Sequence, residues 1–184
     1  MPRRARRLAL VLVALLVIAG VVLVLTSRPR LEDDRSAVED GWTVQLRTPL
    51  GDRYQRLTDV VVQLREAGAG DRDVTRALAR ELDRWDELRR ASDPDVAAEV
   101  ETANRLEGLA GRVNASVATS PRLSGTQPLT DALVAFGTSA PSAPAVRDYN
   151  DDAEAYQKTR QELRYSFAAR IFGFDAIPAL VLGA

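Results

Sequence analysis

The stretch VRDYNDDAEAYQKTRQELRYSF at positions 146–167 decides the fold, because its inward positions recur at helical spacing. These positions follow steps of three and four residues, and they are Val146, Tyr149, Ala153, Tyr156, Arg160, Leu163 and Phe167. Such steps form a heptad seam, here with one polar member. Six of the ten aromatic residues lie between Tyr149 and Phe174. We therefore expect one helix whose seam fills the core, with Phe172 and Phe174 capping its end.

Upstream segments repeat the same helical period. The first contains Val38, Trp42, Leu46, Leu50, Tyr54, Leu57, Val61 and Leu64; the second contains Val74, Leu78, Leu82, Trp85 and Leu88; the third contains Val96, Val100, Ala103, Leu106, Leu109, Val113 and Val117. A short helix around Leu129 and Phe136 and a proline-containing loop at 137–144 precede the last helix. Pro49 and Gly51 predict a kink or break inside the first segment. No segment alternates as a strand does, so the sequence predicts an all-α, antiparallel helical bundle.

The N-terminal part of the chain has a different character. Residues 8–25, LALVLVALLVIAGVVLVL, are all apolar or glycine. As a helix they extend about 27 Å, close to the ~30 Å thickness of the bilayer core. The run is longer than the ~7–15 apolar residues of a cleaved signal peptide, and the LTSRPR that ends it is a poor cleavage site. The sequence therefore predicts a basic N-terminus with a single transmembrane anchor at 1–30 and a helical bundle at 31–184.

The charges differ between these two parts. Residues 1–30 contain six arginines and no acidic residue, whereas 31–184 contain 19 basic and 26 acidic residues, a net charge of −7. Four arginines precede the apolar run, so the positive-inside rule places the N-terminus in the cytoplasm and the bundle outside it, at the cell membrane. An acidic body argues against nucleic-acid binding, which needs a basic face. We expect the lipid bilayer and other membrane or envelope proteins as partners.

Short motifs near the C-terminal end resemble a known family. They are Arg147-Asp148-Tyr149-Asn150, Ala155-Tyr156 and Phe172-Gly173-Phe174, joined by Val38-Glu39-Asp40-Gly41-Trp42 and Glu101-Thr102-Ala103-Asn104 further upstream. Together they resemble the pattern of the LemA family of bacterial membrane-anchored helical proteins. This chain has Gln157 where the family has an asparagine after the second tyrosine. The resemblance implies a helical bundle on one membrane anchor, with no established catalytic activity.

The residue types exclude several classes of enzyme. The chain has no histidine and no cysteine, which removes histidine bases, cysteine nucleophiles, disulfides and nearly all zinc and iron–sulfur sites. Asp148, Asn150 and Asp152 form the D-x-N-x-D opening of a calcium loop, but Ala153 and Thr159 stand where an EF-hand needs glycine and a bidentate acid. We expect an acidic helix start there instead. The sequence thus predicts no catalytic, cofactor-binding or metal-binding residue, no cofactor and no enzymatic activity.

Two polar residues at the seam carry further predictions. Asn150 is expected to be a buried anchor that bonds the backbone of a neighbouring helix or of the 137–144 loop, with ligand binding as the alternative. Arg160 is expected to pair with an acid on another helix, or else to extend to water at a gap in the bundle. For the whole chain, the leading hypothesis is a membrane-tethered interaction or scaffold protein of the bacterial envelope. The alternative is a membrane-tethered sensor whose bundle binds a small ligand and acts through a partner.

Overall fold

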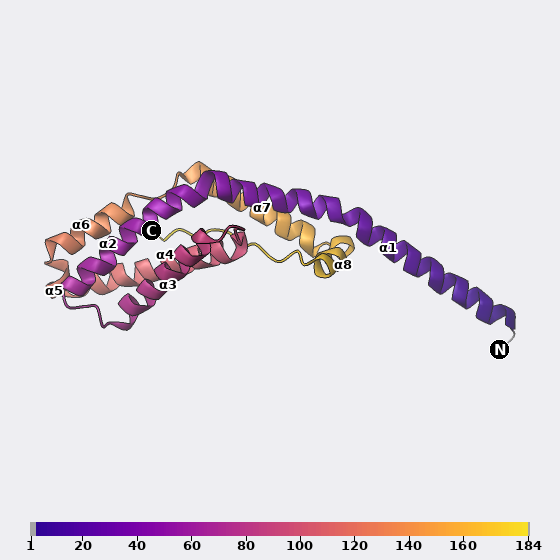
Figure 1. The fold of residues 1–184 in the computed structure, drawn as a ribbon, viewed down its shortest axis with the longest axis horizontal. Coiled ribbons are helices and arrows are strands. Elements are labelled where there is room, and N and C mark those ends of the chain that lie inside the picture. Colours follow the sequence, from indigo (N-terminus) through magenta and orange to yellow (C-terminus); the bar gives the residue numbers. More distant parts are fainter. Residues whose placement is uncertain (1–2, 184) are drawn as a thin grey trace.

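The computed structural model describes residues 3–183, with the side chains at positions 3–12, 14, 16, 17, 19 and 21 outside the description. Every regular element of the described chain is a helix (Figure 1). In chain order they are α1 (Arg3–Asp40), the π-helical segment η1 (Gly41–Leu46), α2 (Arg47–Glu66), α3 (Asp73–Arg90), α4 (Val96–Ala118), α5 (Pro121–Ser124), α6 (Gln127–Gly137), α7 (Ala143–Gln161) and α8 (Leu163–Phe172). The prediction of an all-α protein is confirmed.

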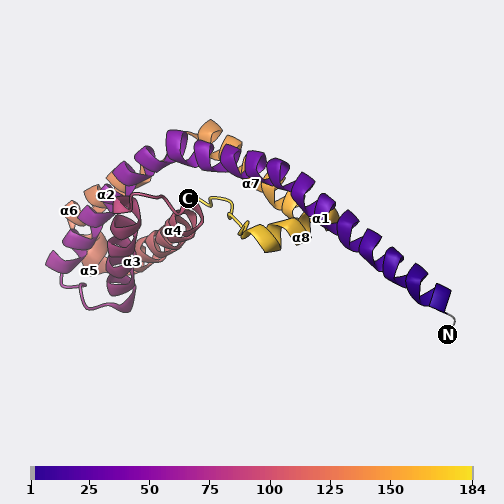
Figure 2. The same cartoon turned by 45° about the vertical axis from the view of Figure 1, so that its right-hand side comes forward.

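α1, η1 and α2 form one long helical rod that bends near its middle (Figures 1 and 2). The buried positions Val38, Trp42, Leu46, Leu50 and Tyr54 are four residues apart, so on a regular α-helix of 3.6 residues per turn they would drift around the axis. The wider π turn of η1 compensates for this drift and keeps them facing inward. Of the kink or break predicted at Pro49 and Gly51, the break is wrong, because α2 runs through both residues. The irregular turn of the rod lies just before them, at Gly41–Leu46.

The remaining helices pack against this rod in separate groups. α7 and α8 contact α1, α6 contacts α2, and the α3–α4 pair packs on another side of α2 (Figure 1). Aromatic rings join these groups where the rod bends. The ring centroid of Trp42 is 5.5 Å from that of Tyr149 and 6.4 Å from that of Trp85, and Tyr54 is 4.9 Å from Trp85. The predicted helical bundle is confirmed, and the apolar stripes of α2, α3 and α4 face its core.

The seam at 146–167 is only partly buried. The three apolar residues of its middle part are in the core as predicted: Tyr149, Ala153 and Tyr156. At Glu162 the backbone becomes extended, with ψ of 136°, so α7 ends and α8 starts in a new direction. Leu163 and Phe167 are consequently 83% and 64% exposed, and the prediction that they lie in the core is wrong. Other residues form the buried face of α8, namely Tyr165, Ala168 and Ala169.

The predicted membrane anchor, residues 8–25, lies in the N-terminal part of α1. Within the described part of the chain, we find no helix that combines the length and the apolarity needed to cross a membrane. More than half of the residues 8–25 have side chains outside the description. Six large apolar side chains that are described in this stretch are exposed: Val13, Leu15, Ile18, Val22, Leu23 and Leu25. α1 itself continues without interruption across residue 30, the predicted boundary between anchor and bundle.

Candidate functional site

The residues after α8, 174–183, form an extended segment that we call the tail. Gly173 ends α8 in the left-handed conformation, with φ of 69°, which glycine adopts without steric cost. From Gly173 the tail turns back beside α7 towards the middle of the bundle (Figures 1 and 2). Its apolar side chains Phe174, Ile177 and Leu180 are buried. The tail therefore occupies a groove, and that groove is the candidate functional site.

Four side chains of α7 hold the tail through its backbone carbonyl groups. The pairs of donor and acceptor residues are Tyr149 with Pro178 (2.9 Å), Tyr156 with Asp175 (2.8 Å), Gln157 with Ile177 (3.1 Å) and Arg160 with Phe174 (2.8 Å). Tyr149 and Tyr156 are seven residues apart, a spacing that returns to the same face of a helix. Because all four bonds go to main-chain oxygens, they fix the path of the tail without contacting its side chains.

Two asparagines hold the same short piece of the tail from opposite sides. Asn150 on α7 accepts from the N–H of Leu180 (2.8 Å) and donates to the carbonyl oxygen of Leu180 (3.0 Å). Asn104 on α4 donates to the carbonyl of Ala179 (2.9 Å) and accepts from the N–H of Val181 (2.8 Å). In an extended chain, the backbone groups of successive residues point to opposite sides. Each helix therefore satisfies the groups on its own side, as neighbouring strands would in a sheet.

A buried ion pair joins this groove to the rest of the bundle. Arg53 of α2 and Glu107 of α4, each 2% exposed, form two parallel hydrogen bonds of 2.7 and 2.9 Å. Arg53 also donates to the carbonyl of Phe136 and stacks on its ring, while Glu107 accepts from the N–H of Gly183 in the tail. Every buried side-chain nitrogen and oxygen of the described residues has a hydrogen-bond partner. The pair thus links α2, α4, α6 and the tail as a structural element.

A second buried carboxylate lies where the rod bends. Glu99 of α4 is fully buried and accepts from the indole Nε1 of Trp42 at 2.7 Å. The guanidinium of Arg47, at the start of α2, binds the same carboxylate at 2.9 Å. Glu99 therefore satisfies polar groups on both sides of the junction between η1 and α2, and it fixes α4 against that junction.

Buried tyrosines in this region have raised pKa values. Burial raises the pKa of Tyr54 well above its ordinary value, and the negative charge of Glu107 adds to the effect. Burial also raises the pKa of Tyr149. It raises the pKa of Tyr156 as well, although the positive charge of Arg35 opposes the shift. At neutral pH all three hydroxyls therefore stay protonated, and those of Tyr149 and Tyr156 remain donors to the tail.

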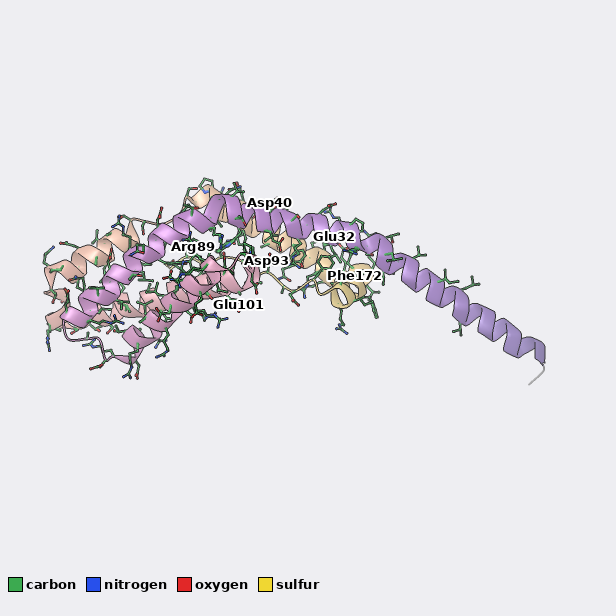
Figure 3. The ribbon with its side chains drawn as sticks, in the orientation of Figure 1. Glu32, Asp40, Arg89, Asp93, Glu101 and Phe172 are labelled. Atoms are coloured by element: carbon green, nitrogen blue, oxygen red, sulfur yellow. The ribbon has the colours of Figure 1, made fainter. Side chains whose placement is uncertain are left out.

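Several hollows open near the tail. A cleft of about 630 Å³ lies between α1, the start of α4 and the start of the tail, and it is lined by the carboxylates of Glu39, Asp93, Asp95, Glu101 and Asp175 together with Arg35. Figure 3 shows Asp93 and Glu101 at the end of the α3–α4 pair that lies nearest the tail. A smaller cavity of about 350 Å³ lies beside the Arg53–Glu107 pair. In the described part of the chain, no cluster of acidic side chains has the arrangement of a metal site.

The structure brings both Asn150 and the polar seam residue Arg160 to the tail. Asn150 bonds a backbone as predicted, but that backbone belongs to the tail and not to a helix or to the 137–144 loop. The predicted ion pair of Arg160 is wrong, because Arg160 binds a tail carbonyl and the side-chain oxygen of Gln157. The acidic stretch 148–152 is helical, as expected.

Sequence analysis missed the tail and the contacts of Asn104 and Gln157 with it. One feature of the sequence does indicate the tail. The apolar stretch AIPALVLG at 176–183 follows the helix-ending Gly173, and Pro178 within it disfavours a helix. Such a segment needs both a partner for its apolar side chains and donors for its backbone.

The fold and the groove together define a helical bundle that holds the extended segment 174–183 along α7 and α4. Comparisons with models of protein families, with curated proteins and with solved structures find no match to this chain. The resemblance to the LemA family stays a prediction.

Proposed function

We propose that this protein is a membrane-anchored interaction protein of the bacterial cell envelope, of the LemA type. In this proposal residues 8–25 cross the membrane once, the N-terminus is cytoplasmic, and the bundle at 31–184 lies outside the cytoplasm. The bundle then presents surfaces to other envelope proteins and catalyses no reaction.

One observation carries the proposal. The N-terminal half of α1 projects beyond all the other helices (Figures 1 and 2), and its described large side chains, Val13, Leu15 and Ile18, are apolar and exposed. A helical surface of this kind is unfavourable in water and favourable in lipid. The 18 residues of the apolar run match the thickness of the bilayer core, and arginines flank the run at both ends.

The interior of the bundle supports a structural role for its ionisable residues. Glu99, Glu107 and Arg53 are buried, and their hydrogen bonds go to other groups of the same chain. The same holds for the tyrosines and asparagines that hold the tail. These residues therefore stabilise one architecture, and the exposed, acidic outer surface remains for contacts with partners.

Cross-linking in intact bacterial cells tests the interaction role. A photo-reactive residue is placed at exposed positions of the bundle, such as Arg147 and Asp151 on α7. The matched control is the same variant without residues 1–30. We expect a reproducible covalent adduct with an envelope protein from the full chain and none from the control. Membrane-bound protein that gives no adduct from any bundle position would contradict the proposal.

The cavity beside the Arg53–Glu107 pair favours a second candidate function, the binding of a small ligand. Its volume of about 350 Å³ is within the range of ligand pockets, and its wall combines a buried charge pair with apolar residues such as Phe136. Gly111 also lines it, and a Cβ atom added there would meet no neighbouring atom within 4 Å. Mass spectrometry of the detergent-extracted protein should then detect a bound molecule that Gly111→Leu excludes. If the unaltered chain carries no bound molecule, this candidate function is rejected.

A further inference from the structure

An apolar stripe on α8 faces outwards. Leu163, Phe167 and Ile171 are four residues apart and therefore share one face of the helix. They are 83%, 64% and 63% exposed. The roughly opposite face of α8 packs against α1 through Tyr165 and two alanines. A helix on the surface of a water-soluble protein exposes polar residues, so the apolar outer face of α8 requires a partner.

The stripe continues into the apolar surface of α1. Phe167 and Ile171 line a hollow of about 650 Å³, and every other residue of its lining is apolar or glycine: Gly20, Leu23, Val24, Leu25 and Phe172. The first four of these belong to the second half of the predicted membrane span. Stripe and span therefore form one continuous apolar surface.

α8 crosses α1 and does not run along it. The hydroxyl of Ser27 on α1 donates to the carbonyl of Arg164, in the first turn of α8. The guanidinium of Arg28, the next residue of α1, lies 5.2 Å from the ring of Phe172, in the last turn of α8. Two adjacent residues of α1 thus contact both ends of α8, and Figure 3 shows Phe172 directly beside the rod. If α1 crosses a membrane, α8 lies parallel to the surface of that membrane.

Exposed arginines surround the stripe, and Arg170, seven residues after Leu163, shares its face. They are Arg28 and Arg30 on α1, and Arg164 and Arg170 on α8. Arg28, Arg30 and Arg164 pair with Glu32, Asp34 and Glu162 at 2.7, 3.1 and 3.9 Å, but ion pairs of such exposed arginines are weak. Long arginine side chains beside apolar positions are typical of the membrane interface, where the guanidinium reaches lipid phosphates.

We propose that α8 lies in the interface of the lipid bilayer, with Leu163, Phe167 and Ile171 inserted among the lipids where α1 leaves the membrane. The inference rests on the proposed span at 8–25, because that span puts the bilayer surface at the level of Leu25 to Arg28, where α8 crosses α1. A phospholipid surface fits the stripe in two respects. The stripe extends the lipid-facing side of α1, and the surrounding arginines complement the phosphate groups. α1 and α8 together then hold the bundle in one orientation on the membrane.

Spin labelling of the full chain tests this proposal. The chain has no cysteine, so each introduced cysteine gives one label site. The test site is Phe167→Cys, which removes no core contact because Phe167 is exposed. The matched control is Val134→Cys on α6, an apolar residue that is 59% exposed and distant from α8 (Figure 1). Leu15→Cys reports on the anchor. Collision rates with oxygen and with a water-soluble nickel chelate, in phosphatidylcholine–phosphatidylglycerol vesicles, give the depth of each label.

We expect the label at Phe167 to lie about 5–10 Å below the lipid phosphates, the depth typical of interfacial helices. The label at Leu15 should lie near the bilayer centre and that at Val134 in water. A lipid-embedded label at Leu15 with a water-exposed label at Phe167 would overturn the inference and leave the proposed anchor standing. A label at Phe167 that neither reagent reaches would also overturn it, since protein then covers the stripe. A water-exposed label at Leu15 would reject the anchor itself, and the inference with it.

Discussion

Replacement of Asn150 by alanine removes both hydrogen bonds between α7 and Leu180. The two bonds measure 2.8 and 3.0 Å, and each is worth about 1 kcal/mol net. Leu180 is buried, so its N–H and carbonyl would also lose their partners, at about 1–3 kcal/mol, unless the tail detaches and becomes hydrated. We therefore expect Asn150→Ala to lower the free energy of unfolding by about 2–3 kcal/mol and to release the tail.

Two assays measure these effects on the full chain in detergent micelles. Urea unfolding followed by circular dichroism gives the loss of stability, and hydrogen exchange of residues 177–183 gives the release of the tail. The matched control is Asn114→Ala, which replaces an exposed asparagine of α4 and should change stability by less than about 0.5 kcal/mol. Unchanged stability and unchanged exchange in Asn150→Ala would refute the reasoning. If such a variant also lost its cross-linked partner, Asn150 would belong to a binding surface.

Further predictions concern other parts of the bundle. Tyr156→Ala, which truncates a fully buried ring, should cost about 3–5 kcal/mol in chemical unfolding, whereas Phe167→Ala should cost less than about 0.5 kcal/mol because its ring is exposed; equal effects would contradict the described helix break. Glu107→Gln should cost about 3–5 kcal/mol, since it leaves the buried charge of Arg53 unpaired, and the double variant Arg53→Met/Glu107→Leu should recover much of that loss; a double variant less stable than the single one would argue against this account. The raised pKa values of Tyr54, Tyr149 and Tyr156 mean that the unfolded chain loses these protons first. Stability should therefore be unaffected below pH ~10 and should fall above it by up to about 1.4 kcal/mol per pH unit for each of these tyrosines. Measurement of the free energy of unfolding between about pH 8 and pH 12 would check this slope. A free energy that does not change with pH would show that the hydroxyls ionise in the folded chain as easily as in the unfolded one.

The stripes of α2, α3 and α4 could be predicted from the sequence because a helix that buries one face must repeat its apolar residues at the helical period. The same logic failed at Glu162. No glycine or proline stands there, and the apolar period continues through it to Phe167. The helix breaks because tertiary contacts outweigh local preference: Tyr165 and its neighbours pack α8 on α1, and Arg160 binds the first residue of the tail.

The position of the irregular turn in the rod was also not predictable from local signals. Proline and glycine at 49 and 51 indicated a kink or break, yet α2 runs through both residues. The π turn at 41–46 is required instead by the four-residue spacing of the buried side chains around Trp42, a pattern that we interpreted as an ordinary helix. The groove could not be predicted from the sequence for a different reason. Asn104 and Asn150 bind main-chain atoms, and a bond to the backbone leaves no complementary residue type in the sequence of the tail.

The central claim is that the N-terminal apolar helix remains in the mature protein and holds the bundle at the membrane. Its most direct test is intact-mass measurement on protein that stays in the membrane fraction after alkaline carbonate extraction. The account predicts that residues 8–25 are present, so that the unprocessed 184-residue chain has a mass of 20.1 kDa. A mature N-terminus beyond residue 25, or release of the full-length chain by carbonate, would contradict it.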